Sequence, residues 1–213
     1  MTTSTSTNNT STEATQYLQS HDQILADIID NSERVTVDST SDVFFDLVTC
    51  ILEQQIHYRA RGVYLRKLME LTNGILPTPE IIRMLDPYDF VMKKIARNKY
   101  DRLQRLAEHW VDNGYEEVEW ALQSNDTVRE KLGDIKGVGQ WTINMILLYT
   151  LGRPDIFDPN DYQLKKVMMA TYGLADDKRL TIEMTSIADR WRPHRSTAVL
   201  YLLSWREKMK QKR

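Results

Sequence analysis

The sequence predicts an all-α fold, and three observations support this. Apolar residues recur at intervals of three and four along most of the chain, which is the period of a helix with one buried face. No convincing run of strict apolar–polar alternation, the pattern of a half-buried strand, lies between these segments. Gly, Pro and Asn residues interrupt the periodic pattern at short intervals, as they do at helix ends. We expect roughly ten helices of about 8 to 16 residues, joined by short turns.

The elements follow in order from the N-terminus. Residues 2–12 contain no apolar side chain, and we expect a disordered tail over residues 1–15. Helices are then expected wherever apolar residues share one face: at Ile24–Ile29, Val43–Leu52, Val63–Leu71, Leu103–Trp110, Val118–Leu122 and Ile143–Leu147. The breaks between helices are expected at residues 73–79, 86–87, 113–114, 152–154, 158–160 and 192–193.

Length and composition exclude several classes of protein. The chain has 213 residues, enough to bury a sizeable core in one domain or two small lobes. Cys50 is the single cysteine, which excludes a disulfide framework, a four-cysteine zinc site and a cysteine-ligated iron–sulfur cluster from this chain alone. No apolar run of eighteen residues and no secretory leader are visible, so we expect a soluble intracellular protein.

The formal net charge of −2 hides an uneven distribution. Residues 1–56 and 111–135 are acidic, with balances of −8 and −5, whereas residues 91–110 and 191–213 are basic, with balances of +4 and +6. This pattern is compatible with one basic face on a nearly neutral molecule. The alternative is that each block is a solvated helix face without a charged partner.

The most informative segment is the predicted hairpin at residues 132–145, where Gly137 and Gly139 bracket Val138 between two helices. The two glycines permit positive φ and close approach, and the amides of the turn and of the following helix suit a phosphate oxygen. An ordinary helix–turn–helix corner is the alternative. The spacing of Ile135 and Val138 predicts that both pin the hairpin into the core, with Trp141 and Met145 on one face of the second helix.

A carboxylate follows 22 residues after Gly139, at Asp161. Pro159 ends the preceding segment, and Asn160 or Asp161 opens a new helix, so a capping role is expected. A carboxylate in this place could also stabilise a developing sugar cation beside a phosphate-binding hairpin. The two roles are compatible with each other.

Taken together, these segments resemble the helix-hairpin-helix superfamily of DNA glycosylases, in particular the 3-methyladenine DNA glycosylase II branch. The hairpin at residues 135–142 and the segment Pro159–Tyr162 carry the resemblance. Residues 51–56 are similar to the family's minor-groove loop, residues 97–107 to its mid-domain helix, and residues 191–196 to its C-terminal signature. The ordered set spans about Tyr17 to Arg206, whereas each motif alone is weak.

The resemblance implies two helical lobes with the active site in the cleft between them, and no additional N-terminal β-domain. One lobe would be residues 43–153, ending in the hairpin. The other would combine residues 16–42 with residues 154–213 and carry the catalytic aspartate.

The resemblance also implies roles for individual residues. Asp161 would be the catalytic carboxylate. Trp141 stands where bifunctional relatives have a Schiff-base lysine, so the chain would hydrolyse the glycosidic bond without cutting the strand. The base pocket would be formed by Trp141, Tyr162, Met145 and Leu203, the last where the family often has tryptophan. DNA would be bound by Gln54, Gln55, Lys136, Gly137, Gly139, Thr142 and Arg195, although Arg195 could instead be a packing or ion-pair residue. A structural Na⁺ or K⁺ would be held by the carbonyls of Gly133, Ile135 and Val138.

The expected function is therefore that of a monofunctional DNA glycosylase acting on alkylated purines in double-stranded DNA, without a catalytic cofactor. The alternatives are a bifunctional glycosylase and abasic-site lyase, or a non-catalytic module that binds damaged DNA. We expect a monomer with no membrane partner, located in the bacterial cytoplasm or in a eukaryotic nucleus.

Overall fold

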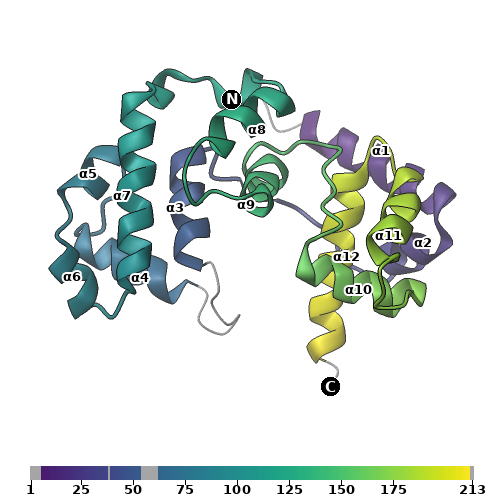
Figure 1. The fold of residues 1–213 in the computed structure, drawn as a ribbon. Coiled ribbons are helices and arrows are strands. Elements are labelled where there is room, and N and C mark those ends of the chain that lie inside the picture. The colour runs from purple at the N-terminus through teal and green to yellow at the C-terminus, as the bar shows by residue number, and fades with distance from the viewer. Residues whose placement is uncertain (1–5, 38, 54–61, 212–213) are drawn as a thin grey trace. The chain divides into compact units, whose positions relative to one another are not determined.

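The structure is a computed structural model that describes residues 6–37, 39–53 and 62–211, and every regular element in these ranges is helical (Figure 1). This confirms the predicted all-α class. The chain divides into two compact units. We call residues 39–151 the hairpin unit and residues 1–38 with 152–213 the aspartate unit. The sequence placed these boundaries at residues 43 and 154.

The hairpin unit contains α3 (Val43–Glu53), α4 (Val63–Leu71), α5 (Pro79–Met84), α6 (Pro87–Met92), α7 (Arg97–Asp112), α8 (Asn125–Gly133) and α9 (Gln140–Met145). Short 3₁₀ turns, η2 (Tyr115–Glu117) and η3 (Trp120–Leu122), connect α7 to α8. A π-helical turn, η4 (Ile146–Thr150), continues α9, with the Leu151 amide bonded to the Ile146 carbonyl at 2.9 Å.

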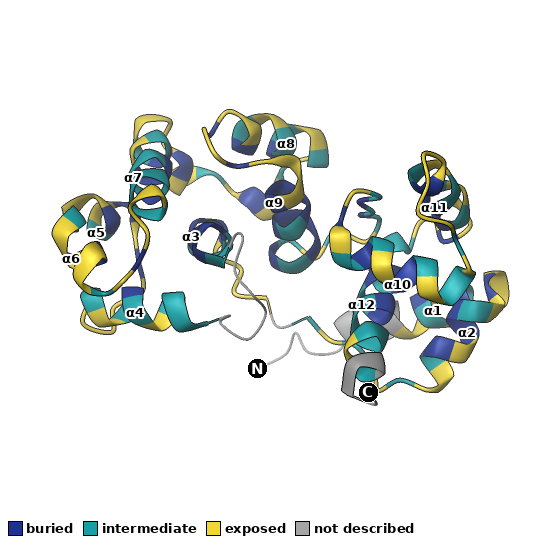
Figure 2. Ribbon diagram, turned by 60° about the horizontal axis from the view of Figure 1, so that its bottom comes forward, coloured by how far each residue is buried: buried dark blue, intermediate teal, exposed yellow. Residues whose placement is uncertain are grey.

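The core of the hairpin unit lies where α3 packs against α7 and η4. Figure 2 shows α3 coloured as buried over much of its length, and buried residues on α9 as well. Trp110 of α7 contacts Phe44 of α3, Tyr115 and Trp120, with ring centroids 5.2 to 5.4 Å apart. Aromatic side chains of this size dominate the burial of apolar surface, so α7 is fixed against α3 along its C-terminal half.

One predicted helix of this unit is wrong. The apolar residues at Val118–Leu122 do not form an α-helix: Leu122 is 78% exposed, η2 ends before Val118, and only Trp120–Leu122 form a helical turn, the 3₁₀ turn η3. Tyr115 and Trp120, which are both buried, are the residues that attach this segment to Trp110. Gly114, at a φ of 62°, ends the preceding helical path in the left-handed region that favours glycine.

The prolines predicted as breaks are also the first residues of short helices. Pro79 and Pro87 occupy the first turns of α5 and α6, where a missing amide hydrogen has no consequence. Thr78 and Asp86 cap these helices by accepting hydrogen bonds from the backbone amides of Ile81 and Tyr88.

The aspartate unit contains α1 (Ser6–His21), α2 (Gln23–Asp30), α10 (Tyr162–Tyr172), α11 (Leu180–Asp189) and α12 (Arg195–Gln211). In this unit α12 packs against α1, α2 and α10. Its buried centre is formed by residues from all five helices and by Trp191. This residue is fully buried and lies in the segment that connects α11 to α12. No helix in the described part of the chain is long and apolar enough to cross a membrane.

The predicted disordered tail over residues 1–15 is wrong from Ser6 onward, because α1 begins there. Ala14 and Leu18 are buried at 3% and 0% exposure and hold the helix against the unit. Once these turns are fixed, each further residue toward the N-terminus adds one hydrogen bond without a new nucleation cost. A prediction from polar composition alone therefore misplaces the first residue of α1. Residues 1–5 lie outside the described residues.

Candidate functional site

The predicted hairpin is present in the hairpin unit, and its tip is pinned as the spacing indicated. Ile135 and Val138 are buried at 1% and 7% exposure, and the Val138 amide donates to the Ile135 carbonyl at 3.0 Å. Gly137 has a φ of +103°, a conformation that L side chains rarely adopt. Gly139, in contrast, has an extended conformation with a φ of −97°. Only the first glycine is therefore required by its backbone angle.

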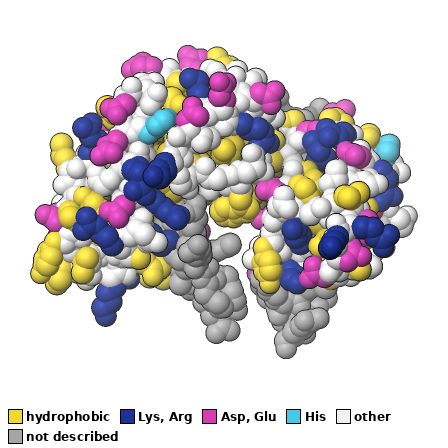
Figure 3. Space-filling model, viewed as in Figure 1, with side chains coloured by type: hydrophobic (Ala, Val, Ile, Leu, Met, Phe, Trp, Pro, Cys, Tyr) yellow, Lys and Arg dark blue, Asp and Glu magenta, His cyan; other side chains and the backbone are white. Residues whose placement is uncertain are grey.

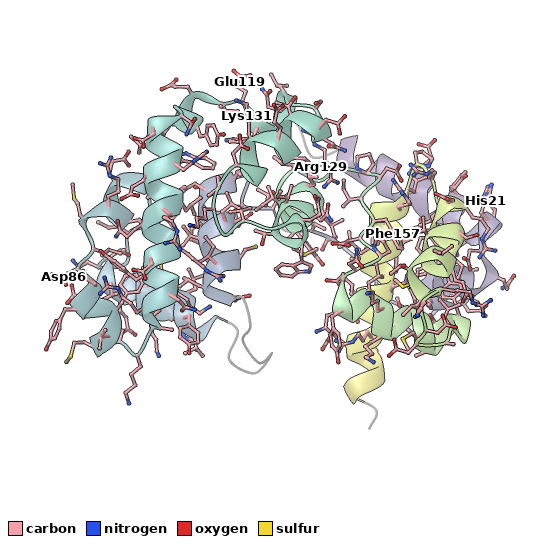
Figure 4. The ribbon with its side chains drawn as sticks, viewed as in Figure 1. His21, Asp86, Glu119, Arg129, Lys131 and Phe157 are labelled. Atoms are coloured by element: carbon pink, nitrogen blue, oxygen red, sulfur yellow. The ribbon has the colours of Figure 1, made fainter. Side chains whose placement is uncertain are left out.

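The helices that flank the turn are joined by a polar contact inside the unit. Asn144 of α9 is 4% exposed, and its Oδ1 accepts from Arg129 Nη1 at 2.7 Å and from Gln140 Nε2 at 3.3 Å. Arg129 and Lys131 both project from α8 (Figure 4). Because a buried amide oxygen needs a partner, this contact fixes the angle between the two arms of the hairpin.

The surface of the turn is polar and carries one positive side chain. Lys136, Gly137 and Gly139 are all exposed. Trp141, the second residue of the following helix, keeps 40% of its surface exposed although it is a large aromatic residue. An exposed lysine and exposed glycines beside an accessible tryptophan can bind an anionic group and stack a planar ring.

Asp161 caps α10 in the aspartate unit. Its Oδ1 accepts a hydrogen bond from the Leu164 amide at 2.7 Å, and its own amide donates to the Asp158 carbonyl at 3.1 Å. Asp158 in turn accepts from the Asn160 amide at 2.9 Å. The residue is 8% exposed, so the carboxylate is held in one orientation at the start of a helix. The capping role predicted from the sequence is confirmed.

The segment that leads into this turn is attached to the start of α12. Ser196 is buried and donates to the Arg153 carbonyl, while its Oγ accepts from the Ile156 amide at 2.8 Å. Arg195 binds Asp155 through Nε at 2.6 Å and through Nη2 at 2.9 Å. Burial raises the pKa of Asp155, but the hydrogen bonds and charge of Arg195 outweigh this and hold the pKa below its ordinary value.

The structure places the remaining predicted base-pocket residues within their own units. Tyr162 begins α10 and is 64% exposed, with Lys166 Nζ 5.6 Å from the centroid of its ring. Leu203 is half-buried on α12, against which α10 packs. Met145 is half-buried in the hairpin unit, at the end of α9. A shared pocket stays a prediction.

The predicted DNA contacts have different outcomes. Lys136, Gly137 and Gly139 are exposed, as binding requires. Thr142 is 1% exposed, so its side chain lies in the interior and not on the surface of the turn. The guanidinium of Arg195 is engaged by Asp155, which is the ion-pair alternative that the sequence left open. Gln54 and Gln55 lie outside the described residues.

The carbonyls predicted to hold a monovalent cation belong to the hairpin turn. Gly133 is the last residue of α8, Ile135 follows it in the turn, and Val138 precedes the cap of α9. Hard cations prefer oxygen ligands, so the donor type fits Na⁺ or K⁺. Among the described residues, no group of three or more His, Cys, Asp and Glu side chains is placed to hold a metal ion.

Sequence reasoning missed two sets of contacts, one in each unit. Asp22, 5% exposed, accepts hydrogen bonds from Tyr172 and Trp191, which lie 150 and 169 residues away. Arg102 of α7 lies against Gly137 of the hairpin. Both contacts join residues far apart in the chain. The only signal for Arg102 was its place in a basic block, and Asp22 had none.

An all-helical fold that carries this hairpin, followed by an aspartate at the start of a later helix, defines a helix-hairpin-helix protein of DNA base repair. The chain belongs to the HhH-GPD superfamily of base excision DNA repair proteins, whose family model matches residues 48–193. The predicted family is therefore confirmed.

Curated relatives carry the names of glycosylases. The DNA-3-methyladenine glycosylase 1 of Schizosaccharomyces pombe is 30% identical over 122 residues, which cover 56% of this chain and 54% of that protein. The putative DNA-3-methyladenine glycosylase YfjP of Bacillus subtilis is 30% identical over 175 residues, which cover 77% of this chain and 58% of that protein. The chain thus spans little more than half the length of these curated relatives.

Two solved structures show the same fold. The S. pombe 3-methyladenine DNA glycosylase in complex with abasic DNA matches with a TM-score of 0.78 and 24% identity, covering 90% of this chain and 95% of that chain. A DNA-3-methyladenine glycosidase from Bacillus halodurans matches with a TM-score of 0.77 and 24% identity, covering 93% of this chain and 91% of that chain.

Proposed function

We propose that the chain is a monofunctional DNA glycosylase that hydrolyses the N-glycosidic bond of alkylated purines of the 3-methyladenine type in duplex DNA and leaves an abasic site. The single observation that carries the proposal is Asp161, a carboxylate held at 8% exposure by the cap of α10 in a chain of the HhH-GPD superfamily. The names of the curated relatives support the substrate class.

The chemistry requires one fixed negative charge. Alkylation at a ring nitrogen makes the purine a cation, which weakens its bond to the sugar and lowers the need for an acid. The departing base leaves positive charge on the sugar, and a carboxylate beside it stabilises that oxocarbenium-like transition state. The same carboxylate orients the attacking water or accepts its proton. Because Asp161 is already ordered by the Leu164 amide, little reorganisation is needed when the charge develops.

Hydrolysis without strand cleavage follows from the residue at position 141. A lyase reaction needs an amine that attacks the sugar and forms a Schiff base. Trp141 has no amine. Position 141 is where the bifunctional enzymes of the superfamily have the lysine that forms the Schiff base. The exposed ring of Trp141 instead offers a surface for stacking a flipped base.

Both units contribute to binding in this proposal. The turn at Lys136, Gly137 and Gly139 contacts the phosphate backbone of the duplex, while Tyr162 and Trp141 present exposed aromatic faces to the cationic base. A cation over an aromatic face gains about 1 kcal/mol, and more when desolvated. Met145 and Leu203 are the apolar residues proposed to contact the same base.

The hairpin is also proposed to bind a structural Na⁺ or K⁺ through the carbonyls of Gly133, Ile135 and Val138. The ion has no part in the reaction and would stabilise the turn. We further propose that the protein acts as a monomer in the compartment that holds the DNA, which is the cytoplasm of a bacterium or the nucleus of a eukaryote.

The test measures base release from a duplex methylated at purines. We expect the wild-type protein to release free methylated purine and the strand to break only after heating with alkali. Asp161→Asn is expected to keep DNA affinity and lose base release by at least about 100-fold, because asparagine still caps the helix but carries no charge. Asp177→Asn is the matched control, since exposed Asp177 also accepts a backbone hydrogen bond, from the Arg179 amide.

Three results would contradict the proposal. Strand cleavage before alkali would show a lyase, and tight binding without release of any base would show a non-catalytic module. Equal base release by Asp161→Asn and the wild type would remove Asp161 from its role.

A further inference from the structure

One side chain from outside the hairpin lies along its turn. Arg102 is half-buried on α7, and a Cβ atom placed on Gly137 would lie 3.6 Å from its Cγ, 3.8 Å from its Cδ and 4.0 Å from its Nε. The aliphatic stem of Arg102 therefore runs beside the one residue of the turn that needs a positive φ. The start of the guanidinium group reaches the same point.

A second basic residue, Lys99, makes a contact from the same face of α7. Lys99 lies three residues before Arg102, and its Nζ donates to the carbonyl of Ile51 at 3.0 Å, near the end of α3. Residues three apart on a helix lie on the same face. Burial, and then the charge of Arg102, lower the pKa of Lys99, so the two positive groups are close enough to interact. One face of α7 thus joins the hairpin turn to the end of α3.

The surface beside Arg102 carries several basic side chains, of which Arg97 is paired with Asp101 of the same helix at 3.0 Å. The four basic residues of α7 are Arg97, Lys99, Arg102 and Arg105, and Lys136 is exposed beside Gly137. Figure 3 shows Lys and Arg side chains gathered over the region of α7. A positive surface that continues from the hairpin turn onto α7 suits the phosphates of a nucleic-acid strand.

We propose that Arg102 is a further DNA-binding residue. Its guanidinium group contacts the backbone phosphate of the DNA that binds at the Gly137 turn. The inference rests on the proposed function, because it assigns double-stranded DNA to this surface. Arginine suits the task because its planar group can form two parallel hydrogen bonds to a phosphate. Packing of its stem against Gly137 restricts the side chain before binding, so less rotamer freedom is lost in the complex.

The test compares charge with packing at this position. Binding of the full chain to a labelled duplex with a stable abasic-site analogue is measured by fluorescence anisotropy at several salt concentrations. Arg102→Met keeps an unbranched stem and removes the charge, whereas Arg102→Lys keeps the charge and removes the planar group. Arg83→Met is the control, because Arg83 is an exposed arginine on α5, away from the hairpin. Urea unfolding confirms that each variant folds.

Arg102→Met is expected to reduce the slope of log affinity against log salt by about 0.9, the value for one lost phosphate contact. It should also weaken binding at low salt by about 5- to 10-fold, with Arg102→Lys between it and the wild type. An unchanged slope in folded Arg102→Met would overturn the proposal, as would an equal loss in Arg83→Met. Base release by the wild type tests the proposed function separately: a chain that binds DNA with an Arg102-dependent slope but releases no base contradicts that function alone.

Discussion

Replacing Asp22 tests how the aspartate unit is held together. The carboxylate caps α2 through Oδ1, which accepts from the amides of Ile24 and Leu25 at 3.0 and 3.1 Å. Its Oδ2 accepts from Tyr172 Oη at 3.0 Å and from Trp191 Nε1 at 2.9 Å. The side chain is 3% exposed, so water does not replace these bonds when the carboxylate is removed.

The expected cost differs between two substitutions. Asp22→Ala removes all four hydrogen bonds and the ion pair with Arg190 at 3.6 Å. Hydrogen bonds to charged groups contribute about 1.5 to 3 kcal/mol each and do not add fully, so we expect a loss of about 3 to 5 kcal/mol. Asp22→Asn keeps one oxygen. Its amide group must then face two donors on one side, and the Trp191 indole cannot act as an acceptor. We expect a loss of about 2 to 3 kcal/mol.

The assay is urea unfolding, followed by tryptophan fluorescence and by circular dichroism. Asp27→Asn is the matched control, because Asp27 lies on the same helix, α2, but is exposed, and it should change stability by less than about 0.5 kcal/mol. Tyr172→Phe should cost about 1.5 to 3 kcal/mol, since it removes one of the four hydrogen bonds to the charged carboxylate. If Asp22→Asn unfolds at the same urea concentration as Asp27→Asn, the buried carboxylate does not hold the unit together and the reasoning fails.

Two further predictions concern titratable groups. Burial, followed by the charges of Asp46 and Glu53, raises the pKa of Cys50 to about 12. At pH 8 the thiol of the native protein should therefore react with a chromogenic disulfide reagent roughly 50-fold more slowly than the thiol of the protein unfolded in urea, as the absorbance of the released reagent would show. Equal rates in the two states would contradict this. The pKa of Asp155 is lowered in the folded state, so its stabilising effect is present above the ordinary carboxyl pKa and is lost as the pH falls below it. Arg195→Gln should therefore be less stable than the wild type at pH 7. Its melting temperature should also fall less than that of the wild type between pH 5 and pH 2. A pH profile of the melting temperature parallel to that of the wild type would refute the pairing.

Features that depend on neighbouring residues were predictable from the sequence. The helical class, the buried Ile135 and Val138, and the cap at Asp161 each follow from spacing within a few residues. The N-terminal limit of α1 was misplaced, because a polar composition does not reveal that Ala14 and Leu18 hold the helix.

Contacts between distant segments were not predictable in this way. Asp22 and Trp191 are 169 residues apart, and no local pattern indicates that one accepts a hydrogen bond from the other. The position of Arg102 beside Gly137 likewise depends on how α7 packs within its unit. Val118–Leu122 shows the reverse error, since a helical spacing was present but the burial of Tyr115 and Trp120 set the conformation.

The cap at Asp161 has an evolutionary consequence. Asparagine is as good a helix cap as aspartate, so a change to asparagine leaves the protein folded and able to grip its target. Under the proposed function, such a molecule would sit on a lesion without excising it and shield the lesion from other repair enzymes.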